Sequence, residues 1–263
     1  MISDESFLRY QRQISVPDIG ESGQVALGSS HVLIIGCGGL GSAASLYLAA
    51  SGVGKLVIVD DDQVELSNLH RQVIYRERDV GKGKVAAMSE QLEDLNRDCS
   101  IRKISYRLGE SQLNLEVALA DIVLDCSDNL PTRQSVNLAC YKQSTPLVSA
   151  AAAGWRGQLM VFDFPHQSGC YRCLYPFDEI EDTISCASIG VVGPVVGAMG
   201  NMQAIAAIQK LAMGRFPSPS HQLKIFDGST LDWQSLMMAS DPTCTVCSDN
   251  PPNNASKLSG GNK

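Results

Sequence analysis

The sequence has little positive charge, few aromatic residues and no long uninterrupted apolar run. Its 21 Lys and Arg residues are outnumbered by 28 Asp and Glu residues, which gives a formal net charge of −7. A nucleic-acid-binding surface needs a basic excess to neutralise phosphates, so this balance argues against a nucleic acid as partner. The N-terminal segment, MISDESFLRYQRQ, carries acidic residues and lacks the apolar core of a signal peptide, so it predicts no export.

The most apolar long stretch, Ile189 to Met213, contains several polar residues. Asn201, Gln203, Gln209 and Lys210 interrupt it, which favours a buried helix over a membrane span. We therefore expect a cytoplasmic protein without a membrane partner. The nine cysteines are an odd number, and in a reducing compartment they indicate metal or thiol chemistry before disulfides.

What the sequence does contain is a nucleotide-binding pattern between His31 and Asp62. An apolar strand (Val32 to Ile35) enters a glycine-rich turn, a helical stretch follows (Ser42 to Ala50), and a second strand (Leu56 to Val59) ends in three aspartates. Glycines let the backbone turn tightly and approach a phosphate, whose charge is met by free N–H groups and the positive end of the helix. The glycines of the turn are Gly36, Gly38, Gly39 and Gly41.

An acid at the end of the second strand completes this pattern. Asp60 lies 24 positions after Gly36, where a carboxylate can accept hydrogen bonds from ribose hydroxyls. The same spacing serves NAD, FAD and ATP sites, so the choice of nucleotide depends on residues further along the chain.

Polar and basic residues gather soon after the aspartates. Ser67, Asn68, Arg71 and Gln72 are close in sequence, and an amphipathic helix is predicted from Gly81 to Leu95. That helix carries Lys82 and Lys84 in its first turn, where cations oppose the helix dipole unless an anion compensates. The placement makes Lys84 or Lys82 a better candidate for binding a phosphate than a surface lysine chosen at random.

A second acidic position follows another buried strand, Asp121 to Cys126. The strand ends in Ser127-Asp128-Asn129, and Pro131 starts the next helix. Ligands of open α/β sheets lie beyond the carboxyl ends of the strands, which places Asp128 on the ligand side. Capping of the helix by an Asp or Asn is an equally good interpretation of this pattern.

The fold class that these patterns predict is α/β, with a Rossmann-like sheet whose parallel first half continues into a mixed or antiparallel second half. The first helix carries Arg9 and Arg12 on one face, typical of a solvated basic face. The remaining predicted elements are helices over Ser3–Gln13 and Glu110–Leu119 and strands over Ile101–Tyr106, Pro146–Ala153, Gly157–Phe164 (antiparallel to its neighbours) and, as the final strand, Leu223–Phe226.

Two C-x-x-C hooks lie far apart in the second half of the chain. They are Cys170-Tyr-Arg-Cys173 and Cys244-Thr-Val-Cys247. Two such hooks make a tetrahedral thiolate site, and four sulfurs leave no position open for catalysis, so we expect structural zinc rather than a redox pair. An acidic segment between the hooks, Pro176 to Ser185, predicts a mobile loop that leads to Cys186.

Six motifs occur in order along the chain: Arg9-Tyr10-Gln-Arg12-Gln-Ile14, GCGGLGS, Leu66-Ser-Asn-Leu-His-Arg-Gln72, Leu124-Asp-Cys-Ser-Asp-Asn129, CYRC and GVVGPVVG. Together they resemble the ThiF/MoeB family of adenylyltransferases, which are related to ubiquitin-activating enzymes. The resemblance covers Phe7 to Cys247. Asp60 to Asp62, Cys170 to Pro176 and Gly190 to Gly197 are most similar to the ThiF branch.

The resemblance implies an enzyme that uses ATP and Mg²⁺ to activate the C-terminal Gly-Gly carboxylate of a small sulfur-carrier protein as an acyl adenylate. For the ThiF branch the carrier is ThiS, for sulfur transfer in thiamine thiazole biosynthesis. The alternative is the MoeB branch, which acts on the carrier MoaD in molybdenum cofactor biosynthesis. An NAD-linked oxidoreductase would leave the basic residues and both cysteine hooks without a joint purpose, and a non-catalytic binding module is the third alternative.

The resemblance also implies roles for individual residues. The loop glycines face the phosphates, Asp60 holds the ribose with help from Asp62, and Asp128 holds Mg²⁺. Asn68, Arg71 and Lys84 match phosphate-contacting positions. Arg12 matches an arginine that reaches the ATP of the partner subunit, which implies a homodimer. Cys186 matches a cysteine that forms a covalent link to the carrier during sulfur transfer, with an unreactive loop thiol as the alternative.

The expected domain organisation is a single adenylation domain over residues 1–247. Its nucleotide-binding half spans about 1–150, its carrier and zinc half spans about 151–247, and residues 248–263 form a polar tail that we expect to be disordered. The tail holds no rhodanese-like segment, so we expect the sulfur donor to be a separate protein.

Overall fold

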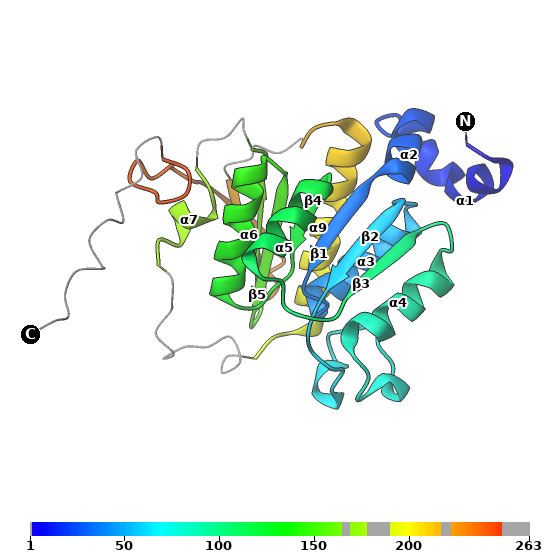
Figure 1. Cartoon of the computed structure of the whole chain (residues 1–263), viewed down its shortest axis with the longest axis horizontal. Helices are drawn as coiled ribbons and strands as arrows, with labels where there is room; N and C mark the ends of the chain where they lie inside the picture. Colours follow the sequence, from blue (N-terminus) through cyan, green and yellow to red (C-terminus); the bar gives the residue numbers. More distant parts are fainter. Residues whose placement is uncertain (1, 165–168, 178–189, 217–221, 249–263) are drawn as a thin grey trace, which may run out of the picture.

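The computed structural model describes residues 2–164, 169–177, 190–216 and 222–248, and it arranges them around one eight-stranded sheet (Figure 1). The order of the strands is β3-β2-β1-β4-β5-β6-β7-β8. Their bounds are β1 His31–Ile35, β2 Lys55–Val59, β3 Ser100–Ile104, β4 Ile122–Asp125, β5 Leu147–Ala153, β6 Arg156–Phe162, β7 Gln222–Asp227 and β8 Asp232–Met237.

Helices lie on both faces of this sheet (Figure 1). Their bounds are α1 Asp4–Ile14, α2 Gly20–Ser29, α3 Gly39–Ala50, α4 Lys84–Leu95, α5 Glu110–Leu119, α6 Leu130–Gln143, α7 Tyr171–Leu174 and α9 Gly193–Met213, with short 3-10 turns η1 Leu66–Asn68 and η2 Glu77–Asp79.

The pairing of the strands changes direction within the sheet. Strands β3, β2, β1, β4 and β5 are parallel, and β5, β6, β7 and β8 pair in antiparallel fashion. This confirms the predicted fold class. The change occurs at β5, which is parallel to β4 and antiparallel to β6, so the predicted division near residue 150 falls inside a strand shared by both halves.

Two hydrophobic cores form on the two faces because successive residues of a strand point in opposite directions. In β1, Val32 and Ile34 pack toward α3, α4 and α9, whereas Leu33 and Ile35 pack toward α5 and α6. All four side chains are buried. This two-sided burial explains why β1 is a continuous apolar run rather than an alternating one.

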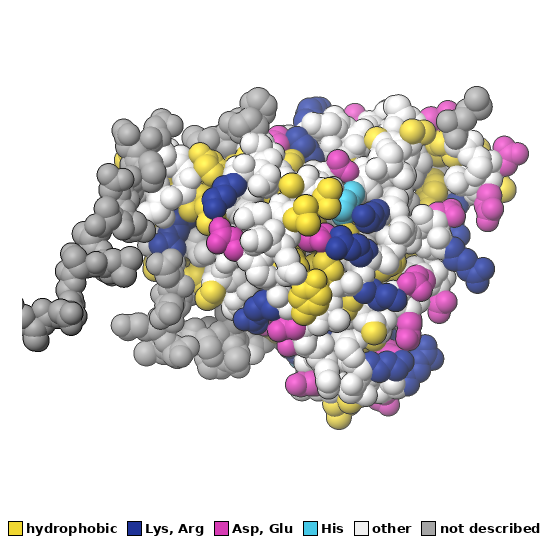
Figure 2. All heavy atoms as spheres, viewed as in Figure 1, with side chains coloured by type: hydrophobic (Ala, Val, Ile, Leu, Met, Phe, Trp, Pro, Cys, Tyr) yellow, Lys and Arg dark blue, Asp and Glu magenta, His cyan; other side chains and the backbone are white. Residues whose placement is uncertain are grey.

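The predicted buried helix is α9, and its burial is confirmed. Small residues bring it close to α3, since a Cβ on Gly200 would lie 2.4 Å from the carbonyl oxygen of Leu40. Within the described residues, no helix is both long and apolar enough to cross a bilayer. On the face drawn in Figure 2, basic side chains are interspersed with acidic ones.

Two element predictions need correction. The helix predicted from Gly81 begins at Lys84, with Gly83 as its N-cap. Gly81 cannot be part of the helix because its φ of +87° is left-handed. The strand at Leu223–Phe226 is not the final one, since β8 pairs with it along the edge of the sheet. All six side chains of β8 are exposed, so the strand lacks the half-buried alternation by which sequence reasoning recognises strands.

Several predictions lie outside the described residues. They concern Cys186, most of the acidic loop (residues 178–185) and nearly all of the C-terminal tail (residues 249–263).

Candidate active site

The glycine turn follows β1 and is shaped by close backbone packing. Gly36 has φ +98°, and a Cβ there would lie 2.7 Å from the carbonyl oxygen of Cys126. A Cβ on Gly41 would lie 2.0 Å from the carbonyl oxygen of Gly36, and one on Gly39 would lie 2.5 Å from Cγ1 of Val196. Backbone contacts therefore exclude side chains at Gly36 and Gly41, and the contact with Val196 excludes one at Gly39.

Gly38 differs from its neighbours because the space beside it is open. The nearest atom to a Cβ built there is Nε2 of Gln72 at 3.8 Å. Gly38 is also the N-cap of α3, and no side chain caps that helix. An uncapped helix start beside open space suits an anion, which the N–H groups and the helix dipole both attract.

Asp60 follows β2 and lies against the glycine turn. Its carboxylate accepts one hydrogen bond from the N–H of Cys37 (2.7 Å) and another from the N–H of Asp62 (2.8 Å). Burial raises the pKa of Asp60, and these two N–H donors oppose the rise. Each carboxylate oxygen keeps a lone pair that can accept a hydrogen bond from a ribose hydroxyl.

The structure separates the two lysines. Lys84 is the first residue of α4, its side chain is 8% exposed, and its Nζ lies 2.7 Å from Oδ2 of Asp62. Lys82 is half exposed and pairs with Asp79 and Glu90 instead. Asp62 is thus the anion that offsets a cation at a helix start, and Lys84 is the lysine beside the aspartates that follow β2.

Asn68 and Arg71 lie on the turn that contains η1. The Nη1 atom of Arg71 donates to the carbonyl oxygen of Ser67 at 3.0 Å and lies 2.9 Å from Nε2 of His70. Asn68 is buried and accepts a hydrogen bond from the N–H of Glu65 at 3.3 Å. The guanidinium of Arg71 has five N–H donors, so it keeps donors for a phosphate.

Asp128 and Asn129 have different roles at the end of β4. Asn129 is the N-cap of α6 and accepts a hydrogen bond from the N–H of Thr132 at 3.0 Å. Asp128 is exposed, and among the described residues its carboxylate accepts a side-chain hydrogen bond only from the amide of Asn129, at 3.4 Å. The capping role therefore falls to Asn129, which leaves the Asp128 carboxylate available to a cation such as Mg²⁺, whose preferred ligands are oxygens.

Among the described residues that were predicted to contact the nucleotide, the structure places only Arg12 away from the others. Helix α1 packs near the amino ends of the strands: Gln13 donates to the carbonyl oxygen of Ser51, and Arg9 to that of Leu95. These carbonyls precede β2 and β3, whereas the glycine turn, Asp60 and Asp128 follow the carboxyl ends of their strands. Arg12 therefore lies at the opposite edge of the sheet from its own chain's glycine turn.

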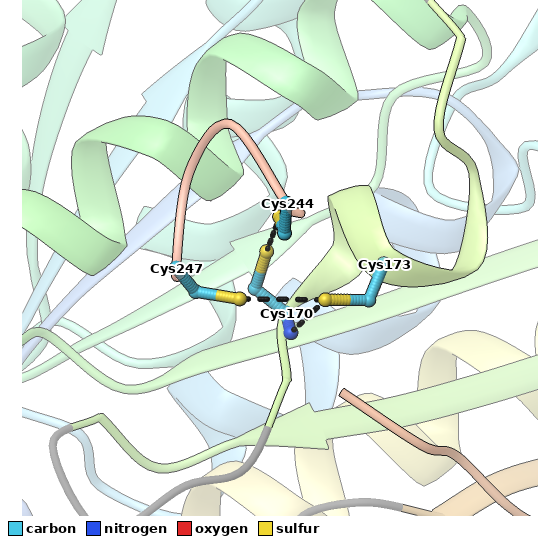
Figure 3. A group of neighbouring side chains, drawn as sticks. All are labelled: Cys170, Cys173, Cys244 and Cys247. Atoms are coloured by element: carbon cyan, nitrogen blue, oxygen red, sulfur yellow. Dashed lines mark hydrogen bonds between the residues drawn. The ribbon is translucent and has the colours of Figure 1, made fainter. Parts of the chain in front are cut away.

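The two cysteine hooks meet in space, as predicted (Figure 3). The sulfur atoms point toward one another and all lie within 4.8 Å, with Sγ–Sγ distances of 3.7 Å for Cys170 and Cys244 and 3.3 Å for Cys173 and Cys247. Tetrahedral zinc with Zn–S bonds of about 2.3 Å requires sulfurs about 3.8 Å apart, so the donor set fits the metal. Burial raises the pKa of Cys170 to about 12, so a bound cation would have to stabilise its thiolate.

Two further side chains adjoin the glycine turn. Tyr75, which the sequence did not single out, donates its hydroxyl hydrogen to the carbonyl oxygen of Cys37 at 2.7 Å. Gln72 is buried, and its Oε1 has no hydrogen-bond partner among the described residues. Both lie within four residues after Arg71, so their closeness in sequence to that basic residue was the signal that could have found them.

Two residues behind the Asp128 turn, Arg133 and Asp125, were not assigned a role from the sequence either.

A parallel sheet with an open glycine turn, a helix start and an acid after the second strand defines a Rossmann-like nucleotide-binding protein. The ThiF family model matches residues 10–246, and the chain belongs to this family.

Curated relatives and solved structures agree with this placement. The chain is 48% identical to the sulfur carrier protein ThiS adenylyltransferase of Escherichia coli K12, covering 94% of this chain and 97% of the relative. It is 39% identical to the E. coli molybdopterin-synthase adenylyltransferase, covering 94% and 98%. Its fold is similar to the crystal structure of E. coli MccB with AMPCPP and MccA, with a TM-score of 0.79, 26% identity and coverage of 94% and 76%.

Proposed function

We propose that this protein is an ATP-dependent adenylyltransferase that activates the C-terminal Gly-Gly carboxylate of a ThiS-like sulfur-carrier protein for thiamine thiazole biosynthesis. The observation that carries the proposal is the pairing of an open phosphate turn at Gly38 with a buried cation, Lys84, beside the adjoining aspartates. A hydride-transferring dinucleotide enzyme has no need for that cation. The 48% identity to a ThiS adenylyltransferase supports the choice of carrier.

The chemistry requires positioning and positive charge more than a general base. A C-terminal carboxylate is already ionised at neutral pH and can attack the α-phosphate of ATP directly. The new bond joins a carboxylate oxygen to phosphorus, the bond to the β-phosphate oxygen breaks, and pyrophosphate leaves. The main cost is bringing two anions together, which cationic side chains and N–H groups reduce.

The residues divide this work by position. Gly36, Gly38, Gly39 and Gly41 form the phosphate turn, Asp60 binds the ribose and Asp62 holds Lys84 in place. Asn68, Arg71 and Lys84 contact phosphate oxygens. Asp128 would hold Mg²⁺, which supplies positive charge at the phosphates when bound.

The zinc site has a structural role in this proposal. Cys170, Cys173, Cys244 and Cys247 provide four thiolates, so a bound Zn²⁺ keeps no position open for substrate. The metal would tie the segment around Cys244 to the body of a single domain, residues 1–247, whose second half receives the carrier.

We also propose a homodimer in which Arg12 completes the site of the partner subunit. Arg12 lies at the far edge of its own sheet, so it serves catalysis only in another copy's site. Subunit mixing tests this. Arg12→Ala and Asp128→Ala are each expected to be inactive. A 1:1 mixture refolded together should regain about a quarter of wild-type activity, because about half of the dimers are mixed and one of the two sites in each mixed dimer is intact. A mixture as inactive as its components would contradict the dimer.

Three further parts of the proposal concern sulfur transfer and location. Cys186 forms a covalent link to the carrier during sulfur transfer, when its thiolate attacks the carbonyl carbon of the acyl adenylate and AMP leaves. A separate protein supplies the sulfur, and the reaction takes place in the cytoplasm. We expect Cys186→Ser to keep pyrophosphate exchange at the wild-type rate and to impair sulfur transfer. Loss of exchange in this variant would assign Cys186 to adenylation instead.

A MoaD-like carrier is the second candidate, supported by the 39% identity to a molybdopterin-synthase adenylyltransferase. ATP–pyrophosphate exchange with purified ThiS or MoaD, each with an intact Gly-Gly terminus, separates the two. We expect exchange with ThiS. Exchange with MoaD alone would move the protein to molybdenum cofactor biosynthesis, and exchange with neither carrier would contradict the proposed activity on both.

A further inference from the structure

A buried ion pair lies behind the turn that carries Asp128. Arg133 of α6 and Asp125 at the end of β4 have side chains that are 8% and 1% exposed, and Nη1 of Arg133 lies 3.4 Å from Oδ2 of Asp125. Burial lowers the pKa of the Arg133 guanidinium, but the charge of Asp125 together with neighbouring groups such as Tyr171 and Cys126 outweighs burial, and the net shift of the pKa is upward. Arg133 is therefore a permanent cation inside the protein.

The pair is connected to the turn by hydrogen bonds in two directions. Nη2 of Arg133 donates to the carbonyl oxygens of Ser127 and Ala150, the latter at 2.8 Å, and Nη1 donates to Oγ of Ser149 at 3.0 Å. Asp125 accepts from the N–H of Ser127 at 3.1 Å and from its hydroxyl at 2.6 Å. Ser127 is thus held through its carbonyl, its N–H and its hydroxyl.

Asp128 lies between two fixed residues as a result. The network holds Ser127 on one side, and Asn129 is held on the other side as the N-cap of α6. The Asp128 side chain itself is exposed and takes no part in the network. The network constrains the backbone of Asp128 and so aims its carboxylate, whose contact among the described side chains is with the Asn129 amide at 3.4 Å.

Stability alone is a poor reason for such a pair. Removing two charges from water costs several kcal/mol, and apolar side chains of similar volume are often as stabilising as a buried ion pair. The hydrogen bond from the N–H of Ser127 to Asp125 and the N-cap of α6 at Asn129 are local, so both would also form without Arg133. What Arg133 adds is a rigid connection from the turn to β5 through Ser149 and Ala150.

We propose that Arg133 and Asp125 are positioning residues, which fix the backbone of Asp128 so that its carboxylate meets the Mg²⁺ of bound ATP. This inference rests on the proposed function of Asp128. The planar guanidinium donates to the turn and to β5 at once, whereas a lysine ammonium keeps the charge and loses that two-way geometry. A misplacement of about 1 Å costs about 100-fold in rate in well-organised sites.

The test is Arg133→Lys, with Arg102→Lys as the matched control. Arg102 donates to both oxygens of the buried Glu116, at 2.6 and 2.7 Å, but lies on β3. Calorimetry measures ATP affinity in buffer with Mg²⁺ and in buffer without added Mg²⁺. We expect Arg133→Lys to reduce the gain in affinity from Mg²⁺ about tenfold and pyrophosphate exchange about 10- to 100-fold. Arg102→Lys should change neither the gain in ATP affinity from Mg²⁺ nor the rate of pyrophosphate exchange, even if it lowers the melting temperature as much as Arg133→Lys does.

Asp128→Asn separates the possible failures. If it abolishes the Mg²⁺ gain while Arg133→Lys keeps the wild-type gain and exchange rate, the positioning inference is overturned and the proposed function stands. If Asp128→Asn also keeps the gain, the magnesium role of Asp128 is overturned, and the inference falls with it. Should Arg133→Lys not fold, Ser149→Ala removes one hydroxyl of the network, and an unchanged Mg²⁺ gain in that variant overturns the inference.

Discussion

The two halves of the sheet hold their polar sites in different ways. In the parallel half, the glycine turn, Asp60 and Asp128 each follow a strand buried in the core, and neighbouring N–H groups or side chains fix their backbones. In the antiparallel half, each short Sγ–Sγ contact joins cysteines 74 residues apart, and the edge strand β8 is wholly exposed. The glycine turn and its acids are therefore held by packing within one half of the sheet, whereas the cysteine cluster joins distant segments and, under the proposed function, would be held by a bound metal.

The largest expected effect breaks catalysis in the parallel half without disturbing the fold. Asp128→Ala removes an exposed carboxylate, so we expect unfolding free energy to change by about 0.5 kcal/mol or less, and pyrophosphate exchange to fall by about 10³-fold or more. Asp94→Ala, an exposed acid on α4, is the control and should leave both unchanged. Exchange retained in Asp128→Ala would remove this residue from the site.

A pair of glycine variants distinguishes packing from ligand approach within the same turn. Gly41→Ala places a methyl group 2.0 Å from a carbonyl oxygen and should cost about 3 kcal/mol or more of stability. Gly38→Ala meets open space, so we expect a loss below about 1 kcal/mol with at least a tenfold weaker ATP affinity. Denaturant unfolding and calorimetry measure the two effects. Unchanged ATP affinity in Gly38→Ala would show that phosphates do not approach there.

Loss of the metal should affect the other half. Cys247→Ser is expected to abolish the single zinc per chain and to lower the melting temperature by about 5–15 °C, since a metal site contributes several kcal/mol to folding. ATP affinity should stay within about twofold of wild type, because the nucleotide site is held by its own packing. Cys99→Ser, a buried cysteine outside the cluster, is the control for zinc content. Wild-type protein purified without chelator and found free of zinc would contradict the site.

The smallest effect concerns Gln72. Its Oε1 is buried and has no hydrogen-bond partner in the part of the chain that the structure describes, so Gln72→Met removes an unsatisfied polar atom at nearly constant volume. We expect unfolding free energy to stay equal or to rise by up to about 1 kcal/mol, measured by urea unfolding. Gln203→Met is the contrast, because that buried amide donates to the carbonyls of Asp125 and Val148, and it should destabilise the protein. A clear loss of stability in Gln72→Met would reveal a hydrogen bond at that position.

Local patterns carried most of what the sequence predicted about the parallel half. Strand, turn, helix and acid lie within 32 consecutive residues, so their order alone implies that they meet at one edge of the sheet. The choice of Lys84 over Lys82 came from the family resemblance. The structure gives it a physical reason, since Lys84 begins a helix beside Asp62.

Long-range contacts explain what the sequence missed. Arg133 pairs with groups on β4 and β5, and nothing near it in sequence marks it as buried. The position of α1 at the amino ends of the strands follows from contacts with Ser51 and Leu95, so the distance of Arg12 from its own glycine turn was invisible to local reasoning. β8 forms through backbone pairing with β7, which its exposed side chains do not signal.

The proposed reaction transfers AMP to the C-terminal glycine of a carrier, and intact-mass spectrometry of the carrier detects that product. Purified protein, ATP and Mg²⁺ are incubated with ThiS and, separately, with ThiS that lacks its terminal glycine. We expect a carrier heavier by one adenylyl group with the complete terminus and no change with the truncated one. An unmodified complete carrier, in the presence of protein that binds ATP and contains its zinc, would contradict the proposed activity.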